Sequence, residues 1–191
     1  FFYGNPLASK GQHQRREWFG TACCPANIAR MIASLGDYIY AKTDDAVYVN
    51  LFVGSNTTIP LKTGDVSVKM ETDYPWQGKV KLAVDPLKKS RFKLLVRLPG
   101  WMWTEPAPGG LYQFTYDRRL SLAPPFSMNV NGKLITYMVK DGYAIIEREW
   151  NKNDVLEFEL PLAVKEIKAR PELKQDTNRI AIQRGPLVYC V

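Results

Sequence analysis

The sequence predicts a mainly β protein, an antiparallel β-sandwich preceded by a short helical segment. After residue 46, apolar and polar residues alternate in many short runs, and glycine, proline, asparagine and aspartate separate these runs. Before that point, residues 25–39 instead carry apolar side chains at three- and four-residue spacing. Many short strands divided by turns at this spacing are typical of a β-sandwich.

The helix is expected from about Pro25 to Ala33 or further. Proline suits the first helical turn, where its missing N–H has no partner to lose. The apolar residues behind it form one stripe: Ile28, Met31, Ile32, Leu35 and Ile39. Cys23 and Cys24 therefore lie at or just before the start of the helix. The unpaired N–H groups and the positive end of the helix dipole favour a thiolate there, which is both a nucleophile and a metal ligand.

The strands follow from the alternation. We expect them at residues 46–53, 57–61, 66–71, 78–84, 92–98, 127–130, 133–138, 143–150, 155–160, 163–169, 179–183 and 187–191. Asn131-Gly132 is the strongest hairpin signal, because both residues tolerate the positive φ of a type I′ turn. Residues 101–125, rich in proline and aromatic residues, are expected to form a long inserted loop.

Length and composition limit the number of domains, the possibility of a membrane span and the kind of partner. A chain of 191 residues with 46% apolar residues has enough material for one soluble domain or slightly more. It contains no apolar run of about 18 residues, so no membrane span is expected. The 26 Lys and Arg exceed the 19 Asp and Glu by seven, but they are scattered among apolar residues, as on the solvent faces of strands. An acidic partner domain is a better match for this charge than nucleic acid.

The first residue is Phe1, and the opening residues are neither a signal peptide nor a usual protein start. The expectation is therefore a fragment of a longer protein. Its three cysteines do not make a disulfide framework, and adjacent cysteines rarely bond each other. Cys190, in an apolar run, is expected to be a buried strand residue.

The cysteine pair is open to two interpretations, an ordinary structural pair or a metal or catalytic site. A zinc site needs four ligands, or three and an open position. Only His13 and Cys190 could add nitrogen or sulfur ligands to Cys23 and Cys24. From these residues alone a complete site cannot be assembled, so any further ligands would lie in another part of the protein.

Two segments around the pair resemble a known family. Residues 18–30 (WFGTACCPANIAR) and 34–40 (SLGDYIY) resemble the cysteine-dependent β-L-arabinofuranosidases of glycoside hydrolase family 127 and its relative, family 146. Residues 3–7 (YGNPL) and 179–190 (RIAIQRGPLVYC) also match. Because the matching blocks lie at both ends, the resemblance covers most of the chain apart from residues 101–125.

The resemblance implies a longer enzyme with an (α/α)6 barrel as its catalytic domain. Residues 1–45 would be the tail of that barrel, residues 46–191 a β-sandwich, and a further β domain would follow. By this resemblance Cys23 is the nucleophile, and Cys23 and Cys24 both bind zinc. The other ligands, a glutamate and a cysteine, and the glutamate acid/base would lie upstream of this chain. Thr21 stands where some members have a third cysteine.

The implied function is that of a retaining glycoside hydrolase acting on β-L-arabinofuranosyl linkages of plant glycans. Retaining enzymes use a nucleophile and an acid/base, and a cysteine nucleophile would pass through a thioglycosyl intermediate that water then hydrolyses. The isolated fragment is expected to be inactive. Its substrate-binding residues are not predicted, and the resemblance implies a bacterial enzyme of the periplasm or cytoplasm.

The alternative function is a non-catalytic β-sandwich that binds carbohydrate or braces a neighbouring domain. Trp76, Trp101 and Trp103 could stack on sugar rings or pack against the barrel. Four glutamates spaced in twos are expected on solvated strand faces: Glu147, Glu149, Glu157 and Glu159. With no second cysteine pair and no basic stripe, a zinc-dependent nucleic-acid module is not indicated.

Overall fold

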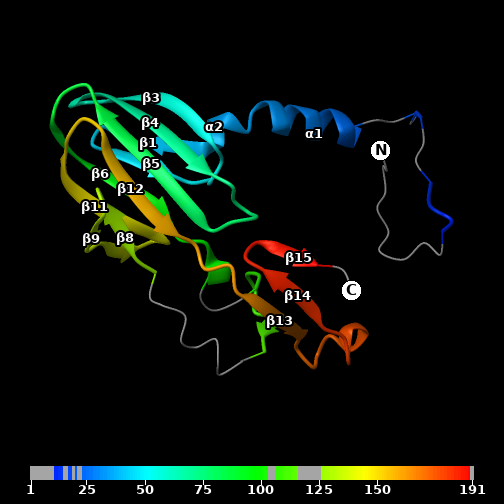
Figure 1. The fold of residues 1–191 in the computed structure, drawn as a ribbon. Coiled ribbons are helices and arrows are strands. Elements are labelled where there is room, and N and C mark those ends of the chain that lie inside the picture. Colours follow the sequence, from blue (N-terminus) through cyan, green and yellow to red (C-terminus); the bar gives the residue numbers. More distant parts are fainter. Residues whose placement is uncertain are drawn as a thin grey trace. The chain divides into compact units, whose positions relative to one another are not determined.

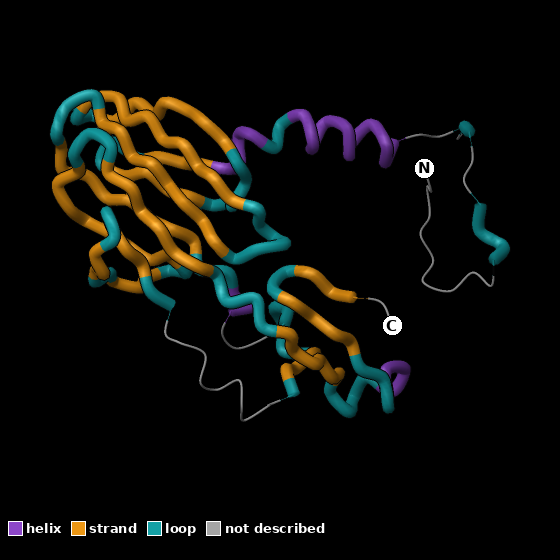
Figure 2. Tube along the Cα trace, viewed as in Figure 1, coloured by secondary structure: helices purple, strands orange, loops and turns teal. Residues whose placement is uncertain are grey.

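The computed structural model describes residues 11–14, 17–18, 20, 23–102, 106–115 and 126–189. The chain separates into two compact units, residues 1–38 and 39–191. The first contains helix α1 (Cys23–Ala33) and most of helix α2 (Gly36–Ile39). The second contains the strands, so the predicted mainly β fold is confirmed (Figures 1 and 2).

Among the described residues of the second unit, the strands form three sheets. The five-stranded sheet has the order β1 (Tyr40–Lys42), β2 (Ala46–Val49), β6 (Ser90–Arg97), β11 (Tyr143–Trp150) and β10 (Met138–Lys140). The six-stranded sheet has the order β3 (Ser55–Leu61), β4 (Gly64–Thr72), β5 (Lys79–Pro86), β12 (Asp154–Glu159), β8 (Met128–Val130) and β9 (Lys133–Ile135). The four-stranded sheet has the order β15 (Leu187–Tyr189), β14 (Ala181–Arg184), β13 (Val164–Ala169) and β7 (Tyr112–Phe114).

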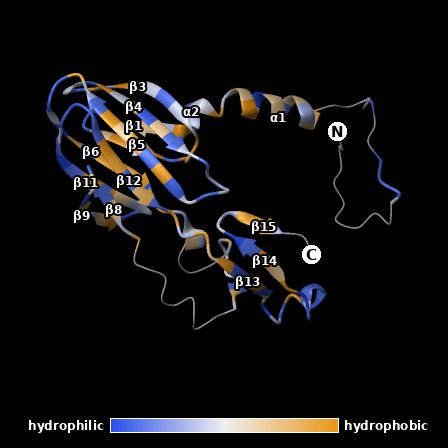
Figure 3. Cartoon of the chain, viewed as in Figure 1, coloured by the Kyte–Doolittle hydropathy of each residue, from blue (hydrophilic) through white to orange (hydrophobic). Residues whose placement is uncertain are grey.

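The two larger sheets share one hydrophobic core. Alternate residues of β4, β5 and β12 are buried, and their apolar side chains join those of β2, β6 and β11 in a single cluster. Figure 3 shows the resulting alternation of hydrophobic and hydrophilic positions along these strands. This is the sandwich that the period of two predicts, because only one face of each sheet needs an apolar partner.

Most strand pairs are antiparallel, but β2 and β6 run parallel, with Val47 opposite Leu94. Both partners are fully buried at 0% exposure. A parallel pair needs a long crossover, and here the crossover is the β3–β4–β5 meander of the other sheet. The parallel pair therefore joins residues 46–49, near the start of the second unit, to residues 93–96 in its middle.

The predicted type I′ turn is present between β8 and β9, where Asn131 has a φ of 52° and Gly132 a φ of 75°. The strand expected over residues 133–138, however, is two strands in different sheets. β9 pairs with β8, whereas β10 pairs with β11. Alternation alone does not show that the chain leaves one sheet for the other between them.

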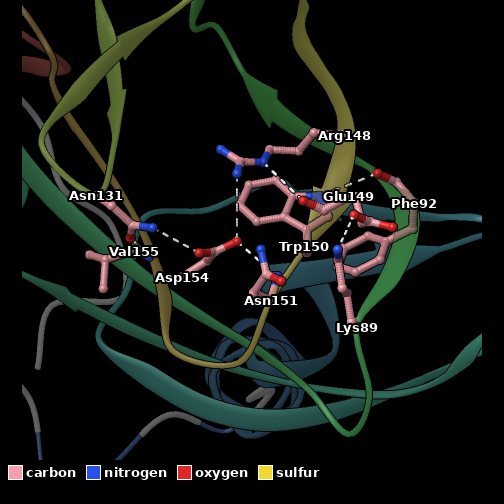
Figure 4. A network of polar contacts seen from close by, with 9 residues as sticks. All are labelled: Lys89, Phe92, Asn131, Arg148, Glu149, Trp150, Asn151, Asp154 and Val155. Carbon is pink, nitrogen blue, oxygen red and sulfur yellow. Dashed lines mark hydrogen bonds and ion pairs between the residues drawn. The ribbon is translucent and has the colours of Figure 1, made fainter.

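A buried polar cluster lies where the chain passes from β11 to β12 (Figure 4). Asp154 is only 4% exposed. Its carboxylate accepts hydrogen bonds from the Asn131 side chain at 2.8 Å and the Asn151 backbone N–H at 2.9 Å, and the Arg148 guanidinium lies 3.9 Å away. Asn131 in turn accepts a bond from the Val155 N–H at 2.9 Å. The cluster thus joins the β8–β9 turn to the β11–β12 turn.

Trp150 fills the core beside this cluster. Its ring is fully buried and stacks on Phe92 at a centroid distance of 5.8 Å, and its indole N–H donates to the Phe92 carbonyl oxygen at 3.3 Å. The Arg148 guanidinium lies 5.2 Å from the Trp150 ring centroid. The same stretch of β11 therefore contributes to both the apolar core and the polar cluster.

The described part of the expected inserted loop, residues 101–125, contains a strand. Residues 103–105 and 116–125 lie outside the described part, but residues 112–114 form β7 and pair with residues 167–169 of β13. The loop composition hides this strand, because its partner is distant in the sequence. The strands after residue 163 also form a separate sheet with β7 instead of extending the sandwich. Cys190, expected in a strand, lies outside the described residues.

Gly78 marks a close approach of two backbones. A Cβ atom added there would lie 2.1 Å from the Leu160 carbonyl oxygen. The Leu160 N–H donates to the Gly78 carbonyl oxygen at 2.9 Å, so the two segments are also bonded. This contact holds the start of β5 against the end of β12.

In the described part of the chain, no helix combines the length and apolar character needed to cross a membrane.

Replacing Asp154 by asparagine is expected to lower the free energy of unfolding by about 2–4 kcal/mol, because an amide nitrogen would then face donors in a buried site. Urea unfolding followed by circular dichroism measures the change. Asp44→Asn is the matched control, since Asp44 is exposed, and it should shift the value by less than about 0.5 kcal/mol. Equal effects of the two substitutions would contradict the role given to Asp154.

Gly78→Ala is expected to cost about 2–4 kcal/mol, because backbone and not a flexible side chain occupies the space of the new methyl group. Gly54→Ala is the control, as its Cβ would lie 3.9 Å from the nearest backbone oxygen. Thermal unfolding of the two variants compares them, and a Gly78→Ala midpoint as high as that of Gly54→Ala would refute the close approach.

Candidate active site and metal ligands

Helix α1 begins at Cys23, two residues before the expected start, so Cys23 and Cys24 occupy its first turn. Pro25 is tolerated as the third helical residue because the first four N–H groups of a helix have no partner within it. The Asn27 side-chain amide donates a hydrogen bond to the Cys23 carbonyl oxygen at 2.9 Å. This bond stabilises the first turn. The predicted placement of both cysteines at a helix N-terminus is therefore present in the structure.

Both cysteines are exposed to solvent. They do not point into packed hydrocarbon, as an ordinary structural pair of thiols would. The rest of α1 is also exposed, and its apolar stripe includes Ile28 at 59%, Met31 at 65% and Ile32 at 69% exposure. The helix thus presents two thiols and an apolar face within the first unit.

The two sulfur atoms lie 3.7 Å apart. Two thiolates bound to one tetrahedral zinc ion, each at about 2.3 Å, would lie about 3.8 Å apart. The spacing and the sulfur donors therefore fit two ligand positions of a zinc site. Within the described ranges, no group of three or more His, Cys, Asp or Glu could hold a metal ion.

The other residues weighed for the site are placed as follows. His13 lies in the described segment 11–14 and is half-buried. Thr21 and Cys190 lie outside the described residues. The structure thus brings together the two ligands that the resemblance implies on this chain.

The tryptophans considered for sugar stacking differ in their surroundings. Trp76 is 66% exposed, whereas Trp101 is half-buried and packs against the sandwich core. The carbonyl oxygen of Trp101 also accepts a hydrogen bond from the Lys165 ammonium at 3.1 Å. Trp103 lies outside the described part of the chain. Of the described pair, Trp76 alone presents its indole ring to solvent.

Trp101 lines a pocket of about 390 Å³ with Phe52, Tyr74 and Arg97 at one end of the sandwich. Burial raises the pKa of the Tyr74 phenol, opposed by a hydrogen bond with Trp101 and the charge of Arg97. Burial also lowers the pKa of Lys165, whose ammonium lies 4.1 Å from the Phe114 ring centroid. Sequence reasoning missed this pocket because its lining comes from segments with no shared pattern.

Comparison with known proteins extends these observations. Residues 46–162 match the domain described as "Beta-L-arabinofuranosidase, GH127 middle domain", and residues 164–191 match the "Glycoside hydrolase family 127 C-terminal domain". The boundary between the matches falls where the structure leaves the sandwich for the four-stranded sheet. Residues 1–45, expected to be a barrel tail, lie outside both matches.

Relatives with known sequence or structure agree with these matches. The chain is 34% identical to the non-reducing end β-L-arabinofuranosidase of Bifidobacterium longum subsp. longum, over 97% of this chain and 26% of that protein. A solved GH127 β-arabinofuranosidase is 38% identical with a TM-score of 0.90, covering 100% of this chain and 29% of that one. The GH127 β-L-arabinofuranosidase Ara127N-Se of Geobacillus stearothermophilus T6 is 36% identical with a TM-score of 0.79, covering 100% and 29%.

The chain therefore spans about a quarter of the length of the curated relative and under a third of the solved ones. These relatives are glycoside hydrolases, and the resemblance carried by the cysteine block is confirmed. With family matches over 46–162 and 164–191, the chain belongs to glycoside hydrolase family 127.

Proposed function

We propose that this chain is part of a retaining glycoside hydrolase that cleaves β-L-arabinofuranosyl linkages of plant glycans with Cys23 as its nucleophile. The observation that carries the proposal is the pair of exposed thiols, 3.7 Å apart in the first turn of α1, in a chain of this family. The names of the relatives support the choice of sugar.

The chemistry assigned to this chain is nucleophilic substitution at the anomeric carbon. The Cys23 sulfur forms a bond to that carbon as the bond to the leaving-group oxygen breaks, and a carboxylic acid outside this chain gives that oxygen its proton. Water then attacks the anomeric carbon from the face opposite the sulfur, and the same carboxylate takes a proton from that water as the carbon–sulfur bond breaks. The sugar is released with its original anomeric configuration.

Cys23 and Cys24 would together hold a zinc ion, with further ligands from an upstream catalytic barrel of which residues 1–45 are the tail. When bound, zinc would favour the thiolate form of these cysteines. The helix N-terminus acts in the same direction, since its N–H groups and dipole stabilise negative charge. Asn27 helps to hold the first turn of α1, and with it the nucleophile, in place.

The sandwich of residues 46–162 supplies no part of this chemistry in the proposal. Its role is to brace the catalytic part of the protein, which agrees with the direct run of α2 into β1 at Ile39 and Tyr40. Ile39 is buried in the sandwich core at 7% exposure. The second unit is thus anchored in the core from its first residue.

In the full-length protein, Cys23→Ser is expected to reduce hydrolysis of an aryl β-L-arabinofuranoside by at least about a thousandfold, because it removes the attacking sulfur. Release of the aryl alcohol measures the rate, and Cys190→Ala is the matched cysteine control, expected to stay near the parent rate. The 191-residue chain alone should show no turnover. Activity retained in Cys23→Ser would refute the nucleophile assignment.

Metal binding has a readout that is independent of activity. Cobalt(II) added to the metal-stripped full-length protein is expected to give a thiolate-to-metal charge-transfer absorption, and Cys24→Ala should weaken cobalt binding about 10–100-fold or more. Cys190→Ala again serves as the control. An unchanged spectrum and affinity in Cys24→Ala would show that Cys24 is not a ligand.

A further inference from the structure

The outward faces of the two large sheets differ in how their charged side chains pair. The five-stranded sheet carries three ion pairs: Lys89 with Glu149 at 2.6 Å, Arg91 with Glu147 at 3.1 Å and Lys93 with Asp45 at 2.8 Å. The hydrogen bond with Asp45 raises the pKa of Lys93, and the same bond lowers that of Asp45. This face follows the expectation of solvated strands with neutralised charge.

Four strands of the six-stranded sheet, β4, β5, β12 and β8, are neighbours in that order (Figure 1). A row of outward side chains crosses them. In register, Glu71 lies opposite Lys81, Lys81 opposite Glu157, and Glu157 opposite Asn129. In the next outward position Lys79 lies opposite Glu159. Among the described residues, none of these opposed pairs forms an ion pair or a side-chain hydrogen bond. Glu71 instead pairs with Lys69 of its own strand at 2.7 Å, which lowers the pKa of Glu71.

These side chains line a groove. Its volume is about 660 Å³, and a second hollow of about 670 Å³ continues it, sharing Gln77, Lys79, Ser127 and Glu159. Each volume is in the range of small-ligand sites, about 300–1,000 Å³. The groove thus offers the side chains of Lys79, Lys81, Glu157 and Glu159, whose opposed pairs form no ion pair in the described part of the chain, whereas Glu71 is paired with Lys69.

Trp76 directly precedes Gln77, which lines both hollows, and its main chain is fixed although its ring is exposed. Its N–H donates to the Asp73 carbonyl oxygen at 2.9 Å, and its carbonyl oxygen accepts from the Arg184 guanidinium at 3.0 Å. Arg184 itself lines the second hollow. Because the backbone of Trp76 is already fixed, stacking the apolar face of a ligand on the indole would cost only side-chain freedom.

The order of charges restricts the occupant. Along the row, a carboxylate, an ammonium, a carboxylate and an amide follow one another. A strongly anionic ligand would be repelled by Glu71 and Glu157, and a strongly cationic ligand by Lys79 and Lys81. A neutral polyhydroxylated ligand can donate to the carboxylates and accept from the ammonium and amide groups. Its C–H faces would also suit an exposed indole.

We infer that the outer face of β4, β5, β12 and β8, together with Trp76 of the adjoining β4–β5 connection, is a non-catalytic binding groove for neutral oligosaccharides. The inference rests on the proposed function only for the sugar that is used as a probe. It would hold glycan chains by contacts that involve no bond cleavage.

Isothermal titration of the 191-residue chain with neutral L-arabino-oligosaccharides of about four to six sugars tests the inference. Binding heat is expected, with the association constant reduced about five- to tenfold in Trp76→Ala and partly restored in Trp76→Phe. Leu87→Ala, in the exposed connection between β5 and β6, is the control and should bind like the parent. Circular dichroism verifies the fold of each variant, and Glu157→Gln, also expected to weaken binding, serves if Trp76→Ala does not fold.

Three results would overturn the inference: no heat up to about 5 mM ligand, equal binding by the parent and the folded Trp76→Ala and Glu157→Gln variants, or preferential binding of an acidic glycan such as polygalacturonate. Failure of the proposed catalytic function is distinguishable, because it would appear as activity retained in the full-length Cys23→Ser variant. That outcome leaves a Trp76-dependent binding heat unaffected.

Discussion

The carboxylate of Asp154 is the contact on which the sandwich depends most. It lies where the chain leaves β11 of one sheet for β12 of the other, and it bonds to Asn131 of the β8–β9 turn and to Asn151 of its own turn. A buried carboxylate is tolerated only when its oxygens have partners. Because those partners come from separate turns, satisfying this group also fixes how the two sheets meet at this end of the core.

Local signals in the sequence predicted much of this arrangement. The burial of alternate residues places β4, β5, β11 and β12 close to the expected ranges, and Asn131-Gly132 forms the expected turn. Signals that depend on a distant partner were absent from the local sequence. β7 lies among prolines and glycines and is a strand because β13 pairs with it, and the separate sheet after residue 163 has the same period as the sandwich strands.

The candidate site shows the same division between local and distant information. A cysteine pair followed by Pro25 and an apolar stripe was enough to predict thiols at a helix N-terminus, because capping and periodicity are local. The 3.7 Å sulfur spacing follows from their adjacency in one helical turn. Further zinc ligands and the acid/base could not be predicted from this chain. The row from Glu71 to Asn129, in which opposed side chains are not bonded to each other, was also missed, because period two indicates an exposed face without showing how its charges pair.

The parallel pairing of β2 with β6 has a consequence for synthesis on the ribosome. Sheet order gives β2 the neighbours β1 and β6, and Val47 reaches its partner Leu94 only after the intervening meander has been made. Until Val96 has left the exit tunnel, the apolar faces of Val47 and Val49 have no sheet to join. The nascent chain must therefore keep its first hairpin, β1 and β2, without its β6 partner while residues 50–96 are made, about a quarter of these 191 residues.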